Sequence, residues 1–401
     1  MRKYDFDTVI DRMNTNSLKY DFAVERGKPA DVLPLWVADM DFRAPQPVLD
    51  ALHRAVEHGI FGYSDVKTDY YEAVSSWFSQ RFGWQTRPEW LVKTPGVVYA
   101  LAMAVRALTQ PSDAVLIQPP VYYPFFSVIR DNGRTVVENQ LVYQEGRYSI
   151  DFEDFERKIV ERQVKLFILC SPHNPVGRVW TPEELQRIGE ICKKHNVCVI
   201  SDEIHCDFAF EEYPHHVFLA VNPELAEQTV VCTAPSKTFN LAGLQVSNIW
   251  IPGNRIRRAF LKEIDRSGYS QLNALGLVAC QAAYESGGEW LEQCRAYLRE
   301  NLDYLRSFLT ANIPEIKLVE PDGTYFAWLD CSGLGLSQRQ LDDLIVNRAK
   351  LWLDAGHIFG GNGSQFQRVV LACPRATLEQ ALHQLHAAVK AERSYLHGHK
   401  I

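Results

Sequence analysis

The sequence predicts an α/β fold, with a mostly parallel central sheet flanked by helices and a smaller α+β domain. Through residues 48–285, short apolar runs alternate with helical patterns of about 10–15 residues, which is typical of βαβ units. After about residue 286 a long helical pattern precedes scattered strands and helices. We therefore divide the chain into an N-terminal segment (1–47), a large domain (48–285) and a small domain (286–401). We expect the N-terminal segment to pack with the small domain.

The first helices are predicted where apolar residues recur at helical spacing and a glycine follows. These helices cover 47–58, before Gly59, and about 69–82, before Gly83. A third helix is predicted from about Tyr99, in the stretch YALAMAVRAL.

The strands of the large domain are predicted at short runs of apolar residues. Thr181 and Pro182 form an N-cap and first helical position, so a helix is expected from there to about Lys194. The predicted strands are 114–118, 164–170, 197–200, 229–233 and 245–251.

The small domain is expected to contain both kinds of element in irregular order. Helices are predicted at 290–311, 338–348 and 377–390, and strands at 317–320, 325–329 and 368–372.

The composition argues against several classes of function. The net charge of −7 disfavours nucleic acids and anionic membranes as partners. No apolar stretch approaches the ~20 residues of a membrane span. The nine cysteines form no CxxC pair, which favours reduced, buried thiols over disulfides or zinc ligands. We expect a cytoplasmic protein without a metal site.

Four chemically distinct side chains each follow a predicted strand. They are Tyr122, Asn174, Asp202 and Lys237. Ligands of open α/β sheets bind beyond the carboxyl ends of the strands, so these residues are expected to meet in one crevice.

Two of these residues have reactive chemistry. Lys237 lies between Ser236 and Thr238, and its amine could attack a carbonyl if burial lowered its pKa; alternatively it is a solvated loop residue. Asp202 could pair with a cationic ring nitrogen, although an Asp after a strand is often only a cap or turn former.

The other candidates have weaker signals. Asn174 could donate to a phenolate oxygen, or Asn174-Pro175 could be a simple turn. Tyr122 could stack on a flat ring or be a core aromatic. Gly96-Val97-Val98 precedes a predicted helix, whose first amides could bind phosphate.

The motifs together resemble the MalY/PatB branch of the fold-type I pyridoxal 5′-phosphate enzymes, the aspartate aminotransferase superfamily. The resemblance spans about residues 4 to 390. Its motifs are Leu35–Phe42 (LWVADMDF), Gly59–Ser64 (GIFGYS), Asn174-Pro175-x-Gly177, Ser201–His205 (SDEIH), Ser236–Gly243 (SKTFNLAG) and Ala372–Arg375 (ACPR).

The resemblance implies a role for each residue at the cofactor. Lys237 would form a Schiff base with pyridoxal 5′-phosphate and move protons at the substrate Cα. Asp202 would pair with the ring nitrogen, Asn174 would bind the ring oxygen O3′, and Tyr122 would stack on the ring and assist catalysis. The phosphate would be held by Gly96, Val97, Val98 and Ser236.

The resemblance also implies how substrate and subunits meet. Arg368 would bind the substrate carboxylate, near Ala38, and Tyr63 would reach the cofactor and substrate of the partner subunit in a homodimer. Arg375 is a rival to Arg368, although its Cys-Pro-Arg setting suggests a turn.

The chain departs from aspartate aminotransferases at two positions. His205 replaces a tyrosine near the cofactor, and Gln245 replaces an arginine that grips the phosphate. His205 is either a cofactor neighbour or a core histidine.

The implied activity is that of a carbon–sulfur lyase acting on L-cystathionine and related L-cysteine S-conjugates. An α,β-elimination would yield a thiol, pyruvate and ammonia. An amino-acid aminotransferase is the alternative, and a non-catalytic cofactor-binding regulator is a further one.

Overall fold

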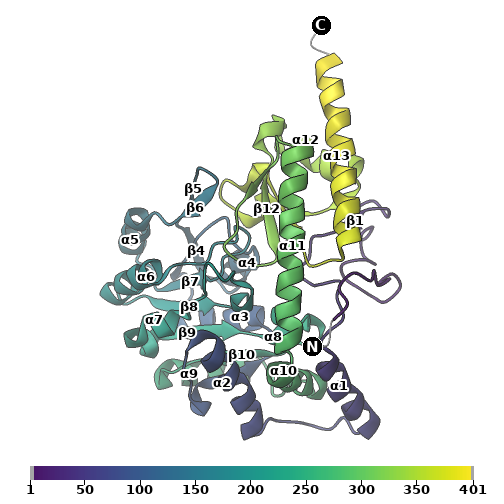
Figure 1. The fold of residues 1–401 in the computed structure, drawn as a ribbon. Coiled ribbons are helices and arrows are strands. Elements are labelled where there is room, and N and C mark those ends of the chain that lie inside the picture. The colour runs from purple at the N-terminus through teal and green to yellow at the C-terminus, as the bar shows by residue number, and fades with distance from the viewer. Residues whose placement is uncertain (1–3, 399–401) are drawn as a thin grey trace.

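A seven-stranded sheet forms the centre of the larger part of the molecule (Figure 1). The computed structural model describes residues 4–398. The strands in spatial order are β2 (Leu91–Thr94), β10 (Ser247–Trp250), β9 (Thr229–Thr233), β8 (Cys198–Asp202), β7 (Leu166–Cys170), β3 (Ala114–Ile117) and β4 (Thr135–Glu138).

All strands of this sheet except β10 run parallel, so the predicted fold class is confirmed. Cys170 pairs with Asp202, and Asp202 pairs with Cys232. This register places the carboxyl ends of β7, β8 and β9 side by side at one edge.

Both faces of the sheet are covered, because alternate side chains of each strand enter different apolar clusters. Leu166 and Ile168 of β7 pack on one side, and Phe167 and Leu169 on the other. The helices of this part are α1 (Gln46–His58), α2 (Thr68–Phe82), α3 (Val97–Leu108), α4 (Pro124–Asp131), α5 (Phe152–Glu161), α6 (Pro182–Lys194), α7 (Phe218–Val221), α8 (Pro235–Thr238), α9 (Asn254–Arg266) and α10 (Ala274–Ser286).

The smaller part is built on a four-stranded antiparallel sheet. In spatial order its strands are β11 (Lys317–Val319), β12 (Phe326–Asp330), β15 (Phe366–Val370) and β14 (Asp354–Ala355). Its helices are α11 (Gly288–Asn312), α12 (Gln338–Asp343) and α13 (Arg375–Gly398). Two short pairs complete the fold: β1 (Leu33–Pro34) with β13 (Leu351–Trp352), and β5 (Val142–Gln144) with β6 (Arg147–Ser149).

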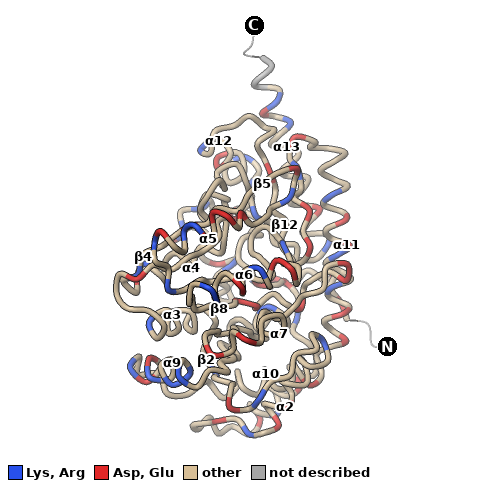
Figure 2. Tube along the Cα trace, turned by 90° about the vertical axis from the view of Figure 1, so that its left-hand side faces the viewer, with Lys and Arg blue, Asp and Glu red and all other residues tan. Residues whose placement is uncertain are grey.

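Helix α11 joins the two parts. Trp290 and Leu291 pack into the core of the larger part, whereas Leu305 and Leu309 pack into that of the smaller part. Along its length this helix carries both acidic residues and arginines (Figure 2). Within residues 4–398, no helix has the length and apolar content needed to cross a membrane.

The N-terminal segment contacts both parts. Leu35 packs into the core of the smaller part, and Phe6 and Phe42 pack into that of the larger part. The division at residues 47 and 285 stays a prediction, and residues 1–3 and 399–401 lie outside the described residues.

Several element boundaries in the small part differ from the predictions. The last helix, predicted at 377–390, is α13 and extends from Arg375 to Gly398. The strand predicted at 368–372 is β15, which ends at Val370. The apolar residues Leu371 and Ala372 made the predicted strand longer, because they are buried although they lie outside the strand. The helix predicted at 338–348 is α-helical only to Asp343 and continues as a π-helix over Leu344–Arg348.

Candidate active site

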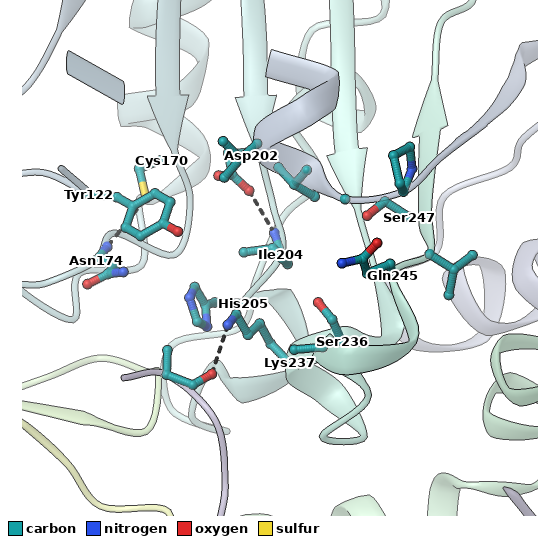
Figure 3. Close-up of a pocket in the computed structure, with 17 residues that line it drawn as sticks. Tyr122, Cys170, Asn174, Asp202, Ile204, His205, Ser236, Lys237, Gln245 and Ser247 are labelled. Carbon is teal, nitrogen blue, oxygen red and sulfur yellow. Dashed lines mark hydrogen bonds between the residues drawn. The ribbon is translucent and has the colours of Figure 1, made fainter. Parts of the chain in front are cut away.

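A cavity of about 230 Å³ lies where β7, β8 and β9 end (Figure 3). All predicted site residues except Tyr63 and Arg368 line it. Those lining residues are Ala38, Gly96, Val97, Val98, Tyr122, Asn174, Asp202, His205, Ser236 and Lys237.

Lys237 enters the cavity from α8, the short helix directly after β9. Its Nζ donates a hydrogen bond to the carbonyl oxygen of Ala38 at 2.8 Å. Burial lowers the pKa of Lys237 to about 8, while the negative charge of Asp39 opposes that shift. About a tenth of this amine is therefore neutral at pH 7, far more than for a lysine with the usual pKa of 10.5, and the neutral form is the one that a nucleophile or base requires.

Asp202 ends β8 and is 4% exposed. Its Oδ1 accepts a hydrogen bond from the backbone N–H of Ile204 at 3.2 Å. Burial raises the pKa of Asp202 to about 7, and the neighbouring charge of Glu203 adds to the effect. A cation beside this carboxylate would restore its charged form, so the site suits a ligand with a cationic nitrogen.

Asn174 lies in the turn after β7. Its Oδ1 accepts a hydrogen bond from Nη1 of Arg368 at 2.9 Å, which leaves the amide N–H groups as donors for a ligand. Gly177, in the same turn, has φ +75°, and a Cβ there would lie 2.6 Å from Cβ of Pro321. The glycine of this motif therefore serves both the turn and a close chain approach.

Tyr122 and His205 bring two rings to the cavity (Figure 3). Burial raises the pKa of Tyr122, so its hydroxyl stays protonated. Burial lowers the pKa of His205 well below its usual value, so its ring is neutral. Nδ1 of His205 is buried and has no hydrogen-bond partner among the described residues.

The first turn of α3 forms another wall, with Gly96 as its N-cap. Unpaired amides in a first helical turn attract anions. Ser236, Gln245 and Ser247 line the same cavity. The sequence drew attention to Gln245 because aspartate aminotransferases carry an arginine at that position. Ser247 was not predicted as a site residue, because it lies in a predicted strand and no motif marks it.

Two predicted residues lie elsewhere. Arg368 is 2% exposed and lies behind Asn174, to which it is hydrogen-bonded. Tyr63 is 95% exposed. The rival arginine, Arg375, donates from Nε to Oδ1 of Asn301 and does not line the cavity.

The cavity therefore offers three kinds of group to one ligand. It has a nucleophilic amine at Lys237, a carboxylate at Asp202 and an anion-attracting helix start at Gly96. A flat ligand with a carbonyl carbon, a cationic nitrogen and an anionic tail matches this set.

A family model for aminotransferase class I and II matches residues 30–385. Among curated proteins, cystathionine beta-lyase PatB of Bacillus subtilis is 43% identical, with 96% of this chain and 100% of that protein covered. Protein MalY of Escherichia coli is 34% identical, with 97% and 100% covered.

The solved structures include cystalysin from Treponema denticola, which contains a pyridoxal 5′-phosphate cofactor. It superposes with a TM-score of 0.94 at 38% identity, and the match covers 97% of this chain and 100% of that one.

Proposed function

The chain belongs to the aminotransferase class I and II family, and from this premise we propose that it is a pyridoxal 5′-phosphate-dependent C–S β-lyase. It cleaves L-cystathionine and related L-cysteine S-conjugates into a thiol, pyruvate and ammonia. The observation that carries the proposal is the placement of Lys237 and Asp202 in one cavity, both buried and both with pKa values shifted toward neutrality.

The residues present fit this cofactor. The amine of Lys237 would bind its aldehyde carbon, and the carboxylate of Asp202 would face its ring nitrogen. The free N–H groups of Asn174 would donate to its ring oxygen. The first amides of α3, with Ser236, would hold its phosphate. When bound, the cofactor draws electrons from the Cα of an attached amino acid.

Lys237 performs the proton transfers. Displaced from the aldehyde carbon by the amine of the substrate, Lys237 would be a free, neutral base that removes the proton from the substrate Cα. The electron pair of that bond would form a Cα–Cβ double bond while the Cβ–S bond breaks. The sulfur takes a proton from Lys237 or from the hydroxyl of Tyr122, which burial keeps protonated. The released aminoacrylate hydrolyses to pyruvate and ammonia.

Arg368 binds the substrate carboxylate, since a guanidinium matches a carboxylate better than an ammonium does. Arg368 does not line the cavity itself but donates a hydrogen bond to Asn174, which does. Ala38, whose carbonyl holds Lys237, borders the substrate position.

The active form is a homodimer in which Tyr63 enters the partner's site. Tyr63 is 95% exposed, next to Ile60 at 73% and Phe61 at 62%. Large apolar side chains that are so exposed in one loop favour burial by another molecule. A second copy of the chain is the simplest partner.

The enzyme works in the cytoplasm. All nine cysteines are free thiols, eight of them buried, which favours a reducing compartment.

The proposal is tested by incubating the holoenzyme with L-cystathionine and no keto acid. Catalytic release of pyruvate and a free thiol is expected. Lys237→Ala should lose at least about a thousandfold in rate, whereas Lys350→Ala, at a half-buried position that does not line the cavity, should retain full activity. Turnover that appears only when a keto acid is added would instead identify an aminotransferase.

A further inference from the structure

Arg368 is held on the side away from the cavity by a carboxylate from the neighbouring strand. Asp354 of β14 lies directly opposite Arg368 of β15 in the sheet register. Nη2 of Arg368 donates to Oδ2 of Asp354 and to the carbonyl oxygen of Trp36, the latter at 2.7 Å.

This pair is almost completely removed from water. Arg368 is 2% exposed and Asp354 is 5% exposed. The guanidinium carbon lies 4.4 Å from the ring centre of Phe326 and 5.0 Å from that of Phe359. A buried ion pair in such a setting fixes geometry strongly, because either charge alone would be costly.

The hydrogen bonds leave part of Arg368 available. A guanidinium has five N–H donors, and Trp36, Asp354 and Asn174 engage three of them. The N–H of Nε is buried without a partner among the described residues. An unsatisfied buried donor is unfavourable, so the substrate-free site is prepared for an additional acceptor.

We propose that Asp354 is a positioning residue for substrate binding. By holding Nη2, it turns the remaining donors of Arg368 toward the α-carboxylate of the substrate and keeps Nη1 on Asn174. This inference rests on the proposed function, since it assumes that Arg368 receives the carboxylate of an amino acid.

The test compares a carboxylate with its uncharged amide. Binding of 3-(methylthio)propanoate and of 3-(methylthio)propanamide to the holoenzyme is measured by calorimetry, together with kcat and KM for S-methyl-L-cysteine. Asp354→Asn keeps an acceptor for Nη2 but removes the charge. It should weaken carboxylate binding and raise KM by about tenfold, with kcat within about threefold and amide binding unchanged.

Two further variants separate positioning from folding. Asp354→Glu should recover part of the lost carboxylate affinity. Asp342→Asn removes a carboxylate from the same surface cavity that Asp354 borders. It should leave carboxylate binding, kcat and KM unchanged, because Asp342 faces His357.

Carboxylate binding that stays unchanged in Asp354→Asn, or amide binding that weakens in parallel, would overturn the inference. The inference would also be overturned if the wild-type enzyme bound 3-(methylthio)propanoate no more tightly than 3-(methylthio)propanamide. The calorimetry measures binding and needs no turnover, so it tests the role of Asp354 independently of the lyase proposal. The lyase proposal fails if the wild type releases no thiol from S-methyl-L-cysteine or L-cystathionine.

Discussion

The amine of Lys237 donates to the carbonyl oxygen of Ala38, a residue 199 positions earlier in the chain. Ala38 precedes a cluster of ion pairs in which Asp41 binds Lys19 at 2.8 Å and Arg12 at 2.7 Å. Tyr325 also donates to the Ala38 carbonyl, at 3.2 Å. The N-terminal segment therefore takes part in placing the reactive amine.

Removing Lys19 should destabilise the protein. Lys19 is fully buried, and its loss would leave Arg12 as the one remaining counter-charge of the buried Asp41 among residues 4–398. We expect Lys19→Met to lower the free energy of unfolding by roughly 3 kcal/mol in urea titrations. Lys350→Met, which removes an exposed pair with Asp31, should change it by less than about 1 kcal/mol. If the two substitutions lowered the free energy of unfolding equally, the buried ion pairs of Lys19 would not stabilise the N-terminal segment more than an exposed pair does.

The rate of cofactor capture by the apoenzyme should depend on pH through Lys237. Its pKa in the folded protein is about 8, below the usual 10.5, so the neutral amine dominates above pH 8. The rate of formation of the protein-bound cofactor, followed by absorbance, should rise up to about pH 8 and then level off. A rise that continues beyond pH 10 would mean that burial does not lower the pKa of this lysine.

Asp202→Asn should impair catalysis more than cofactor retention. A carboxylate about 4 Å from a ring nitrogen supports the protonated ring by roughly three pKa units at an effective dielectric constant near 20. The rate of thiol release should therefore fall at least about a hundredfold. Absorbance of the dialysed variant should still show bound cofactor, because Lys237 and the start of α3 remain. A variant with wild-type kcat would exclude the assigned role.

The role of Tyr63 is tested by mixing two inactive variants. In a dimer of Tyr63→Ala and Lys237→Ala subunits, one site regains both side chains if Tyr63 acts across the interface. Random 1:1 mixing should then restore up to about a quarter of wild-type activity. No recovery after mixed dimers are verified by mass spectrometry would place Tyr63 in its own subunit's site. A Tyr63→Ala variant that is fully active by itself would place Tyr63 outside catalysis.

Much of the fold could be predicted from local patterns. Thr181 caps α6 in the structure, with a capping box to Glu184, and Gly59 and Gly83 end α1 and α2 in the left-handed conformation. Strands such as β7 and β8 were visible because strands buried on both faces are continuously apolar. Residues 135–138 (TVVE), at the sheet edge, and 91–94 (LVKT) carry weaker patterns, and these strands were not predicted.

The chemical types of the site residues and their order along the chain can be predicted from the amino-acid sequence. Asp202 ends a strand, whereas Tyr122, Asn174 and Lys237 come after strands, and parallel strands bring their carboxyl ends to one edge. The lowered pKa of Lys237, the contact of its amine with Ala38 and the pairing of Arg368 with Asp354 arise from the folded arrangement. These depend on burial and on contacts between distant segments, which local sequence patterns do not encode.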